Sequence, residues 1–443
     1  MRSLWTESCS IPGFSSLPGD AETEVLIIGG GITGVLCAYF LEQRGIRYIL
    51  VERNRIGSGV TEDTTAKITV QHGLIYHKLV DRFGTEAAAL YYQANHNALK
   101  TYAELCADLD CDFEWKPSYV YSMNDRDLLE KEAEALRKLN LADHLQDFTE
   151  LPFDVAGAIR FDQQAQFHPL KFLAAIAEKR NIYEHTHVRE LQKQEALTNH
   201  GTIRFQKAIF ATHFPMDNKH GLYFLKLYQH RSCMIALERA PVFNGMYVDE
   251  DRKGMSFRSY KDRLLIGGGG HRTGKEGGNW KELRAFAKRY YPEAVETMAW
   301  AAQDCMSLDQ IPYIGQYSNN MPGCYVATGF NKWGMTSSMV AAQLLTDLIC
   351  GETSPYREIF DPSRSMFRPQ LFLNAVEAGK NLLTPSRKRC PHLGCALKWN
   401  PEEHSWDCPC HGSRFDEYGK LLNNPANGNL RKDKKDKNGR GNK

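Results

Sequence analysis

The sequence has none of the features that mark a nucleic-acid-binding, secreted or membrane-spanning protein. Its 443 residues carry a formal net charge of only +2, so there is no basic excess with which to hold nucleic acid. No segment approaches the roughly 20 consecutive apolar residues of a membrane helix. Residues 1–21 contain Gly, Pro and Ser where a secretory signal would need a continuous apolar core. We therefore expect a cytoplasmic protein with an N-terminal extension over residues 1–21 and no transmembrane segment.

Clustered cysteine is absent from most of the chain. Eight of the twelve cysteines are scattered, as small buried side chains are in a reducing compartment. The other four lie between positions 390 and 410 and need a separate explanation. The basic excess is local: it lies in the final thirteen residues of the part 429–443, and those thirteen include no apolar side chain. We expect that part to be a disordered tail.

The segment from Glu24 to Asn54 indicates a dinucleotide-binding unit. Val25–Ile28 is a short apolar run typical of a buried strand, and a G-x-G-x-x-G pattern follows it at once. A helix over Val35–Leu41 comes next, then a second strand, Tyr48–Val51, which ends in an acidic residue that can meet ribose hydroxyls. The alternative is a glycine-rich turn inside an ordinary α/β core. The predicted cofactor-binding residues here are Gly29, Gly30, Gly31, Ile32, Thr33, Gly34, Glu52 and Arg53.

A distant segment favours FAD over NAD. Residues 324–351, "CYVATGFNKWGMTSSMVAAQLLTDLICG", predict a strand, a loop and a helix that ends at Gly351. This segment resembles the flavin-closing part of the D-amino-acid oxidase and glycine oxidase superfamily, as do "MSLDQIPYIGQYS", "RNRIGSGVTEDTTAKIT", "FHPLKFLAAIAEK" and "AIFATHFP". The resemblance spans roughly residues 22–350. It implies that Gly329, Gly334, Met335 and Thr336 lie at the isoalloxazine end of FAD.

The same resemblance sets the predicted domain organisation. Residues 222–270 alternate polar and apolar side chains as antiparallel strands do, and Thr85–Asp110 and Asp127–Leu141 have helical spacing. We expect an α/β protein with a discontinuous Rossmann-like FAD-binding domain, an antiparallel-sheet substrate domain and a small C-terminal module. The expected bounds are 22–84, 150–220 and 305–351 for the FAD-binding domain and 85–149 and 221–304 for the substrate domain. A linker with a helix over Pro369–Leu383 covers 352–387, and the module covers 388–428.

The resemblance suggests two catalytic residues. His271 follows "LLIGGGG", where related amine oxidases can bring a histidine to the flavin, and Lys67 in "TTAKIT" would lie near the flavin as a cation that favours its reduced, anionic form. Each is alternatively an ordinary loop residue. Arg231 and Tyr260 are weaker candidates, Lys332 and Trp333 could shape the pocket, and the "HTH" at His185–His187 is interpreted as surface polarity.

The clustered cysteines predict a metal centre. Cys390 and His392 form C-x-H, and Cys408 and His411 form C-x-x-H further on. Thiolates and imidazoles at such spacing suit either zinc or an iron–sulfur cluster. The pattern resembles the Rieske signature, in which two cysteines hold one iron and two histidines the other, and this resemblance implies a 2Fe-2S cluster. It also implies a disulfide between Cys395 and Cys410, a Ser413 hydroxyl directed at cluster sulfur, and a third loop over 424–426.

The cluster module is expected to be short. Rieske domains normally build several strands before the first ligand loop, whereas here only "TPSRKR" separates the predicted helix from Cys390. A module of about forty residues has too little apolar surface to be stable by itself, so the cluster and the disulfide would have to stabilise it.

Together these features predict an FAD-dependent oxidoreductase. The resemblance favours a dehydrogenase of an amine or amino acid, with electrons passing singly between the flavin and the cluster and an external one-electron carrier as partner. One alternative is an oxygen-using amine oxidase with a non-functional cluster module. Another is a flavoprotein whose C-terminal part is an interaction module stabilised by zinc or a disulfide.

Overall fold

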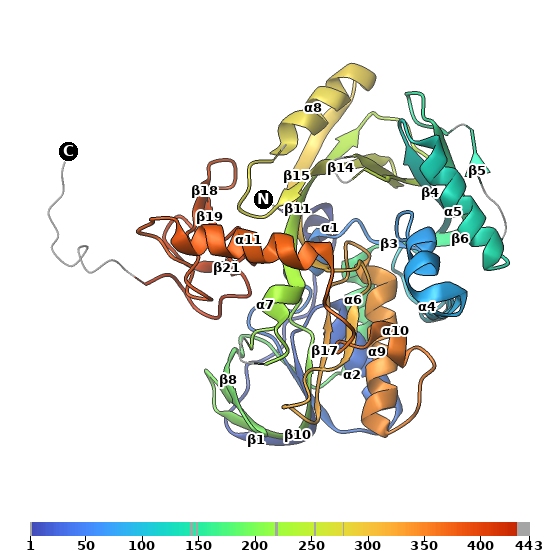
Figure 1. The fold of residues 1–443 in the computed structure, drawn as a ribbon. Helices are drawn as coiled ribbons and strands as arrows, with labels where there is room; N and C mark the ends of the chain where they lie inside the picture. The colour runs from blue at the N-terminus through green and yellow to red at the C-terminus, as the bar shows by residue number, and fades with distance from the viewer. Residues whose placement is uncertain are drawn as a thin grey trace, which may run out of the picture.

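The computed structural model describes residues 2–141, 145–147, 149–217, 220–251, 254–277 and 279–431. Two large β-sheets with their helices form most of the molecule, and a small third sheet lies at the C-terminal end beside helix α11, Pro369–Leu383 (Figure 1). The predicted α/β class with an antiparallel second sheet and a small C-terminal module is therefore confirmed. The predicted basic tail lies outside the described residues from position 432 onward.

The first sheet is built on the apolar segments that the sequence assigns to buried strands. Strand β1, Ala21–Ile28, pairs in parallel with β2, Tyr48–Val51, and with β10, Thr202–Phe210. Helices α2, Ile32–Gln43, and α9, Gly334–Cys350, pack against each other beside these strands. The other members of this sheet are β7, Ile182–Tyr183, β8, Val188–Gln192, β9, Glu195–Thr198, β16, Tyr313–Gln316, and β17, Cys324–Thr328.

The second sheet is largely antiparallel and follows the predicted alternation. Its path is β15-β11-β14-β13-β12-β4-β6-β3, and β5 pairs with β6. The bounds are β3, Lys67–Ile68, β4, Glu114–Ser122, β5, Leu145–Gln146, β6, Gly157–Gln166, β11, Leu227–Glu238, β12, Met246–Asp249, β13, Ser256–Tyr260, β14, Arg263–Arg272, and β15, Val295–Ser307. Strand β6 differs from the expectation, because its residues were grouped with the FAD-binding domain but pair with β4. The sequence pattern of β6 does not reveal that it pairs with a strand as distant in the chain as β4.

The helices surround these sheets. The long helix α4, Tyr76–Cys106, begins earlier than predicted because two helical segments meet at a kink at Gly84. Within the described residues, no helix is both long enough and apolar enough to cross a bilayer. The remaining helices are α1, Leu4–Ser8, α3, Val60–Asp63, α5, Arg126–Lys138, α6, Pro169–Ala177, α7, Tyr223–Lys226, α8, Asn279–Tyr290, and α10, Arg357–Phe360.

The C-terminal module is short, as expected, but it has a sheet of its own. Four three-residue strands pair in the antiparallel order β18-β19-β20-β21, and all of them follow the first cysteine loop. Their bounds are β18, Lys398–Asn400, β19, Ser405–Asp407, β20, Arg414–Asp416, and β21, Leu421–Asn423. Helix α11 packs beside this sheet, where Asn381 accepts a backbone hydrogen bond from Ala396. Helix and sheet together hold the cysteine loops.

Candidate functional site

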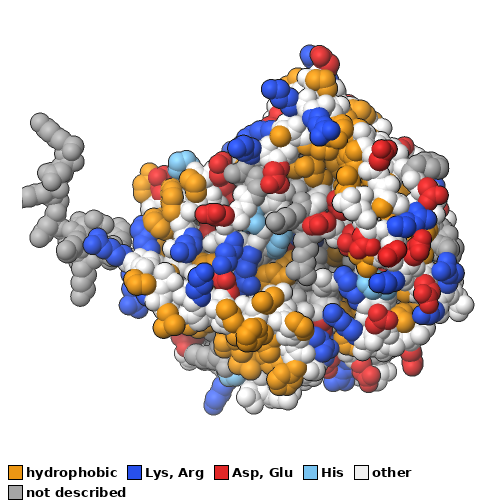
Figure 2. Space-filling model, turned by 45° about the horizontal axis from the view of Figure 1, so that its top comes forward, with side chains coloured by type: hydrophobic (Ala, Val, Ile, Leu, Met, Phe, Trp, Pro, Cys, Tyr) orange, Lys and Arg blue, Asp and Glu red, His pale blue; other side chains and the backbone are white. Residues whose placement is uncertain are grey.

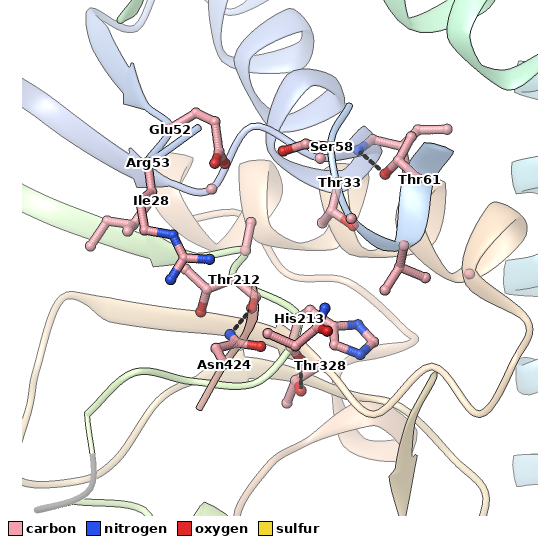
Figure 3. A pocket seen from close by; sticks show the side chains of 18 of the residues that line it. Ile28, Thr33, Glu52, Arg53, Ser58, Thr61, Thr212, His213, Thr328 and Asn424 are labelled. Atoms are coloured by element: carbon pink, nitrogen blue, oxygen red, sulfur yellow. Dashed lines mark hydrogen bonds between the residues drawn. The ribbon is translucent and has the colours of Figure 1, made fainter. Parts of the chain in front are cut away.

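A first cavity of about 410 Å³ lies where the carboxyl ends of β1, β2, β10 and β17 meet. Ligands of open α/β sheets bind at this edge. Figure 3 shows Glu52, Arg53 and Thr61 on one side of the cavity and His213 and Asn424 on the other. Nine of the predicted cofactor-binding residues line it: Gly29, Gly31, Ile32, Thr33, Glu52, Arg53, Gly329, Gly334 and Met335.

The glycine turn of this cavity is shaped to receive a large polar ligand. Gly29 has a φ of +110°, which a residue with a side chain rarely adopts. The Glu52 carboxylate accepts hydrogen bonds from the backbone N–H groups of Gly30 and Asn54, both at 2.8 Å, while burial raises its pKa. The turn leads directly into helix α2, whose N-terminal end favours an anion such as a pyrophosphate. These residues fit FAD.

Three predicted cofactor-binding residues do not line the cavity. Gly30 lies behind it against Glu52, and Gly34 packs against the carbonyl of Gly29. Thr336 contacts His72, with 2.9 Å between the Thr336 hydroxyl and the ring Nε2. Gly30 and Gly34 therefore support the turn from outside the cavity, and Thr336 joins α9 to residues 69–72.

Substitution of the glycines should separate ligand binding from folding. A Cβ on Gly31 would meet only the Thr61 hydroxyl, at 3.2 Å, whereas a Cβ on Gly34 would lie 1.9 Å from the Gly29 carbonyl oxygen. We expect Gly31→Ala to fold normally and bind FAD about 10-fold more weakly. Gly34→Ala should lose about 3 kcal/mol of unfolding free energy. Flavin titration and urea unfolding measure the two effects, and equal effects in both variants would contradict this assignment.

A second cavity of about 240 Å³ adjoins the first. Asp304 and Lys332 line both cavities. Burial raises the pKa of Asp304 to about 6, although the charge of Lys332 opposes this shift. Lys67 also lines the second cavity, and burial, with the nearby Arg258 cation, lowers its pKa to about 7. This cavity therefore combines basic and acidic groups that titrate near neutrality.

The other predicted pocket residues take different places. Lys332 and Trp333 line the second cavity. His271 lies at the end of β14 and lines neither cavity described here, because its Nδ1 is held 2.9 Å from the Gly269 carbonyl oxygen. Tyr260 donates a hydrogen bond to Asp112 at 2.8 Å, and Arg231 pairs with an acid of the C-terminal module.

The C-terminal loops bring together the four predicted cluster ligands. Cys390 and Cys408 are 2% and 1% exposed, and the rings of His392 and His411 are neighbours, with centroids 4.9 Å apart. The Cys408 thiol and then the Ser413 hydroxyl lower the pKa of the Cys390 thiol to about 7. This environment stabilises the thiolate of Cys390, which is the form that binds iron, whereas the Cys390 side chain and burial raise the pKa of Cys408.

Further details of the loops fit an iron–sulfur cluster. Cys395 and Cys410 form a disulfide that ties the two loops together, and their sulfur atoms lie within 4.8 Å of the Cys408 sulfur. His411 Nδ1 is buried without a hydrogen-bond partner among the described residues, as a nitrogen reserved for a metal would be. The Ser413 hydroxyl also accepts the backbone N–H of Ala426 at 3.0 Å, which fixes the third loop.

The third loop of the module also forms a wall of the first cavity. Residues 422–427 line that cavity, and Ala426 packs among the cluster cysteines. The Asn424 side-chain amide donates a hydrogen bond to the Thr212 carbonyl oxygen at 2.5 Å (Figure 3) and another to the Phe214 carbonyl oxygen at 2.8 Å. Phe214 in turn lies beside both cluster histidines, with ring centroids 6.1 and 6.2 Å from theirs. One loop thus contacts both candidate cofactor sites.

Two glutamines of the second sheet fix the module in place. Gln229 on β11 donates to the carbonyl oxygens of His411 and Asn424, both at 2.9 Å. Gln303 on β15 donates to the carbonyl oxygen of Gly412 at 2.9 Å. Because the bonds to His411 and Gly412 are buried and involve a predicted ligand loop itself, they hold the module in one orientation.

Sequence reasoning missed several residues of the site. His213 lines the first cavity, its Nε2 is buried without a partner among the described residues, and burial lowers its pKa to about 4. The interpretation of "HTH" as surface polarity was wrong for His187, because this residue lines the same cavity. The distance from its Nε2 to Oδ1 of Asn427 is 2.5 Å. One signal was available for His213, since "ATHFP" follows the carboxyl end of a buried strand. Only the folded chain brings Asn427 to His187.

Comparison with known proteins agrees with this geometry. Residues 24–348 match the model of the FAD dependent oxidoreductase family, and residues 364–433 match that of the Rieske [2Fe-2S] domain. YhfW of Bacillus subtilis (strain 168), whose name describes a Rieske 2Fe-2S iron-sulfur protein, is 34% identical over 96% of each chain. The iron-sulfur subunit of the cytochrome b6-f complex of Nostoc punctiforme is 54% identical over 37 residues, which are 8% of this chain and 21% of that subunit.

Solved structures resemble the larger part of the fold. Glycine oxidase from Geobacillus kaustophilus superposes with a TM-score of 0.65 at 19% identity, over 78% of this chain and 99% of that one. L-proline dehydrogenase from P. horikoshii gives a TM-score of 0.65 at 19% identity, over 79% of this chain and 98% of the other. At this identity the likeness concerns the fold alone. The Rieske match, by contrast, favours an iron–sulfur cluster over zinc for the C-terminal ligands.

Proposed function

Because this chain belongs to the FAD dependent oxidoreductase family and carries a Rieske [2Fe-2S] domain, we propose that it is a dehydrogenase of an amine or amino acid. In this proposal electrons pass singly between the bound FAD and the cluster, and an external one-electron carrier completes the reaction. FAD exchanges two electrons with an organic substrate, whereas a 2Fe-2S centre carries one at a time.

The observation that carries this proposal is the wall shared by the two cofactor sites. Residues 422–427 line the first cavity, and the same loop is bonded through Ala426 to Ser413 beside the cluster ligands. The cluster histidines are 9% and 4% exposed, so they face the body of the protein and not solvent. Burial of these two histidines against the body of the protein is not needed in a module that only recognises partners.

The second cavity supports an amino-acid-like substrate. It is lined by the cations Lys67, Lys78 and Lys332 and by the acids Asp249, Glu250, Asp251 and Asp304. A mixed set of charges suits a substrate that carries both an ammonium and a carboxylate group. Glycine oxidase and L-proline dehydrogenase, whose folds this chain shares, are named for substrates of this class.

Lys67 acts in this proposal as the cation beside the reacting ring. Its pKa of about 7, lowered by burial and by Arg258, means that the charge is present below pH 7 and is lost as the pH rises through 7. We expect kcat/KM in a dye-coupled assay to fall above pH 7, and Lys67→Met to remove that step and to lower kcat/KM about 10-fold at pH 6. Lys116→Met, outside both cavities, should keep the wild-type profile. An unchanged profile in Lys67→Met would contradict the role.

His271 is a second candidate for a role in the reaction, but its side chain would have to move in order to reach the substrate. In the structure its ring is turned toward its own strand, at the Gly269 carbonyl. If it takes part in the reaction, His271→Ala should lower kcat with no change in flavin content. If His271→Ala keeps the wild-type kcat, the residue has only a local structural role.

Spectroscopy of the anaerobic protein tests the function directly. Glycine and L-proline serve as probe substrates, and absorption and EPR spectra are recorded before and after substrate and after dithionite. We expect a substrate to bleach the flavin and to produce the EPR signal of a reduced cluster in the same sample. Flavin bleaching that leaves the cluster oxidised would contradict electron exchange. Peroxide release in air by protein without iron would favour an oxidase with a non-functional module, and stoichiometric zinc without acid-labile sulfide would favour an interaction module.

A further inference from the structure

Helix α11 exposes several large apolar side chains to solvent and buries two asparagines against the protein. Phe372, Leu373 and Val376 are 70%, 55% and 51% exposed, whereas Asn374 and Asn381 are 4% and 3% exposed. A helix on the surface of a globular protein has the opposite arrangement. The exposed side of α11 therefore needs an explanation beyond the stability of the fold.

Polar contacts fix the helix in this orientation. Asn374 accepts a hydrogen bond from Arg272 at 2.9 Å and donates one to the carbonyl oxygen of Leu225 at 3.2 Å. Glu377 forms an ion pair with Lys275 at 2.6 Å. Rotating the helix to bury its apolar side would break all three contacts, so the exposure of that side is built into the fold.

The exposed apolar surface continues beyond the helix to the first cluster loop. Phe367 and Leu383, at the two ends of α11, are 83% and 85% exposed, and Leu393, between His392 and Cys395, is 38% exposed. We define the α11 patch as Phe367, Phe372, Leu373, Val376, Leu382, Leu383 and Leu393. Side chains exposed to this degree project from the surface instead of lining a groove.

The segment that carries the patch is basic. Between positions 364 and 393 the only acid is Glu377, which is turned inward to Lys275. The basic residues of the same segment are Arg364, Arg368, Lys380, Arg387, Lys388 and Arg389, of which Arg364 is committed to a buried ion pair with Asp309. The space-filling view shows a face of the molecule on which hydrophobic side chains gather beside those of Lys and Arg (Figure 2).

We propose that the α11 patch docks on an anionic lipid bilayer. The apolar side chains of an interfacial helix enter the boundary of the acyl chains, while Lys and Arg contact the anionic headgroups. A second copy of this chain would bring like charge against like charge. A small acidic carrier protein would form a small, wet interface that leaves projecting Phe and Leu side chains unburied. This inference rests on the surface alone and stands whether or not the proposed function is correct.

Co-sedimentation of the full-length protein, with its cofactors, tests the docking. We expect the wild type to pellet with vesicles that contain phosphatidylglycerol and to remain in solution with pure phosphatidylcholine. Phe372→Glu and Leu383→Glu should each weaken binding at least 10-fold, and Lys380→Gln and Arg387→Gln about 5-fold each. Val242→Glu is the matched control, since Val242 is 59% exposed outside the patch. Unchanged flavin and cluster spectra show that each variant is folded.

Several results would overturn the proposal. One is a wild-type protein that does not pellet with phosphatidylglycerol vesicles. Another is a Phe372→Glu protein that binds these vesicles as tightly as the wild type does. A wild-type dimer that Phe372→Glu converts to monomer, without vesicle binding, would assign the patch to a second copy. A protein truncated after residue 431 tests whether the basic tail, and not the patch, binds the vesicles. If vesicle binding by this truncated protein does not depend on Phe372, the patch is not the docking surface.

Discussion

His411→Ala is expected to abolish iron and acid-labile sulfide in the purified protein while leaving its FAD content unchanged. His411 is predicted to be one of four cluster ligands, and its side chain is buried, with 4% of its surface exposed. Because cluster binding contributes to the folding of so short a module, the variant should also unfold at a lower temperature. Iron and sulfide analysis, flavin absorbance and thermal unfolding measure these effects.

The control for this experiment lies in the same module. His404, in the turn between β18 and β19, is exposed to solvent and lies outside both predicted ligand loops. His404→Ala should retain iron, sulfide and FAD at wild-type levels. A His411→Ala protein with a full complement of iron would show that the cluster is held by other residues, and the ligand assignment would then be wrong.

The second large effect is expected at the buried ion pairs that join the module to the second sheet. Glu403 contacts Arg231 on β11 at 2.5 Å and Arg414 on β20 at 2.9 Å, and the Arg231 and Glu403 side chains are only 4% and 12% exposed. Glu403→Gln would leave the buried Arg231 guanidinium facing a neutral partner, whereas Arg414 would keep its ion pair with Asp407 at 2.9 Å. We expect a loss of about 3 kcal/mol of unfolding free energy, since removal of one partner leaves buried charge uncompensated.

An exposed ion pair provides the comparison. Glu130 pairs with Arg126 on α5, where the two side chains are 58% and 38% exposed. Glu130→Gln should cost less than about 1 kcal/mol, because water already screens that pair. Urea unfolding of both variants gives the difference. If Glu403→Gln is no less stable than Glu130→Gln, the network does not hold the module to the sheet.

The sequence by itself determined the parts of this protein that depend on local patterns. The G-x-G-x-x-G turn lies between β1 and α2 as predicted, because glycine positions and apolar runs constrain the backbone within a few residues. Helix α11 has the predicted bounds, Pro369–Leu383. The disulfide between Cys395 and Cys410 is confirmed, and the four ligands stay a prediction made on the same ground: metal and disulfide chemistry require particular side chains at short spacing.

Only the tertiary structure decided how these parts meet. Asn424 reaches Thr212, and Gln229 reaches His411, across about two hundred residues, and no periodicity in either segment encodes such a contact. The orientation of α11 was equally hidden, because a helical pattern predicts an apolar side but not whether the protein covers it. The joining of the two cofactor sites by one loop is a product of packing, since it depends on which surfaces are complementary once the sheets have formed.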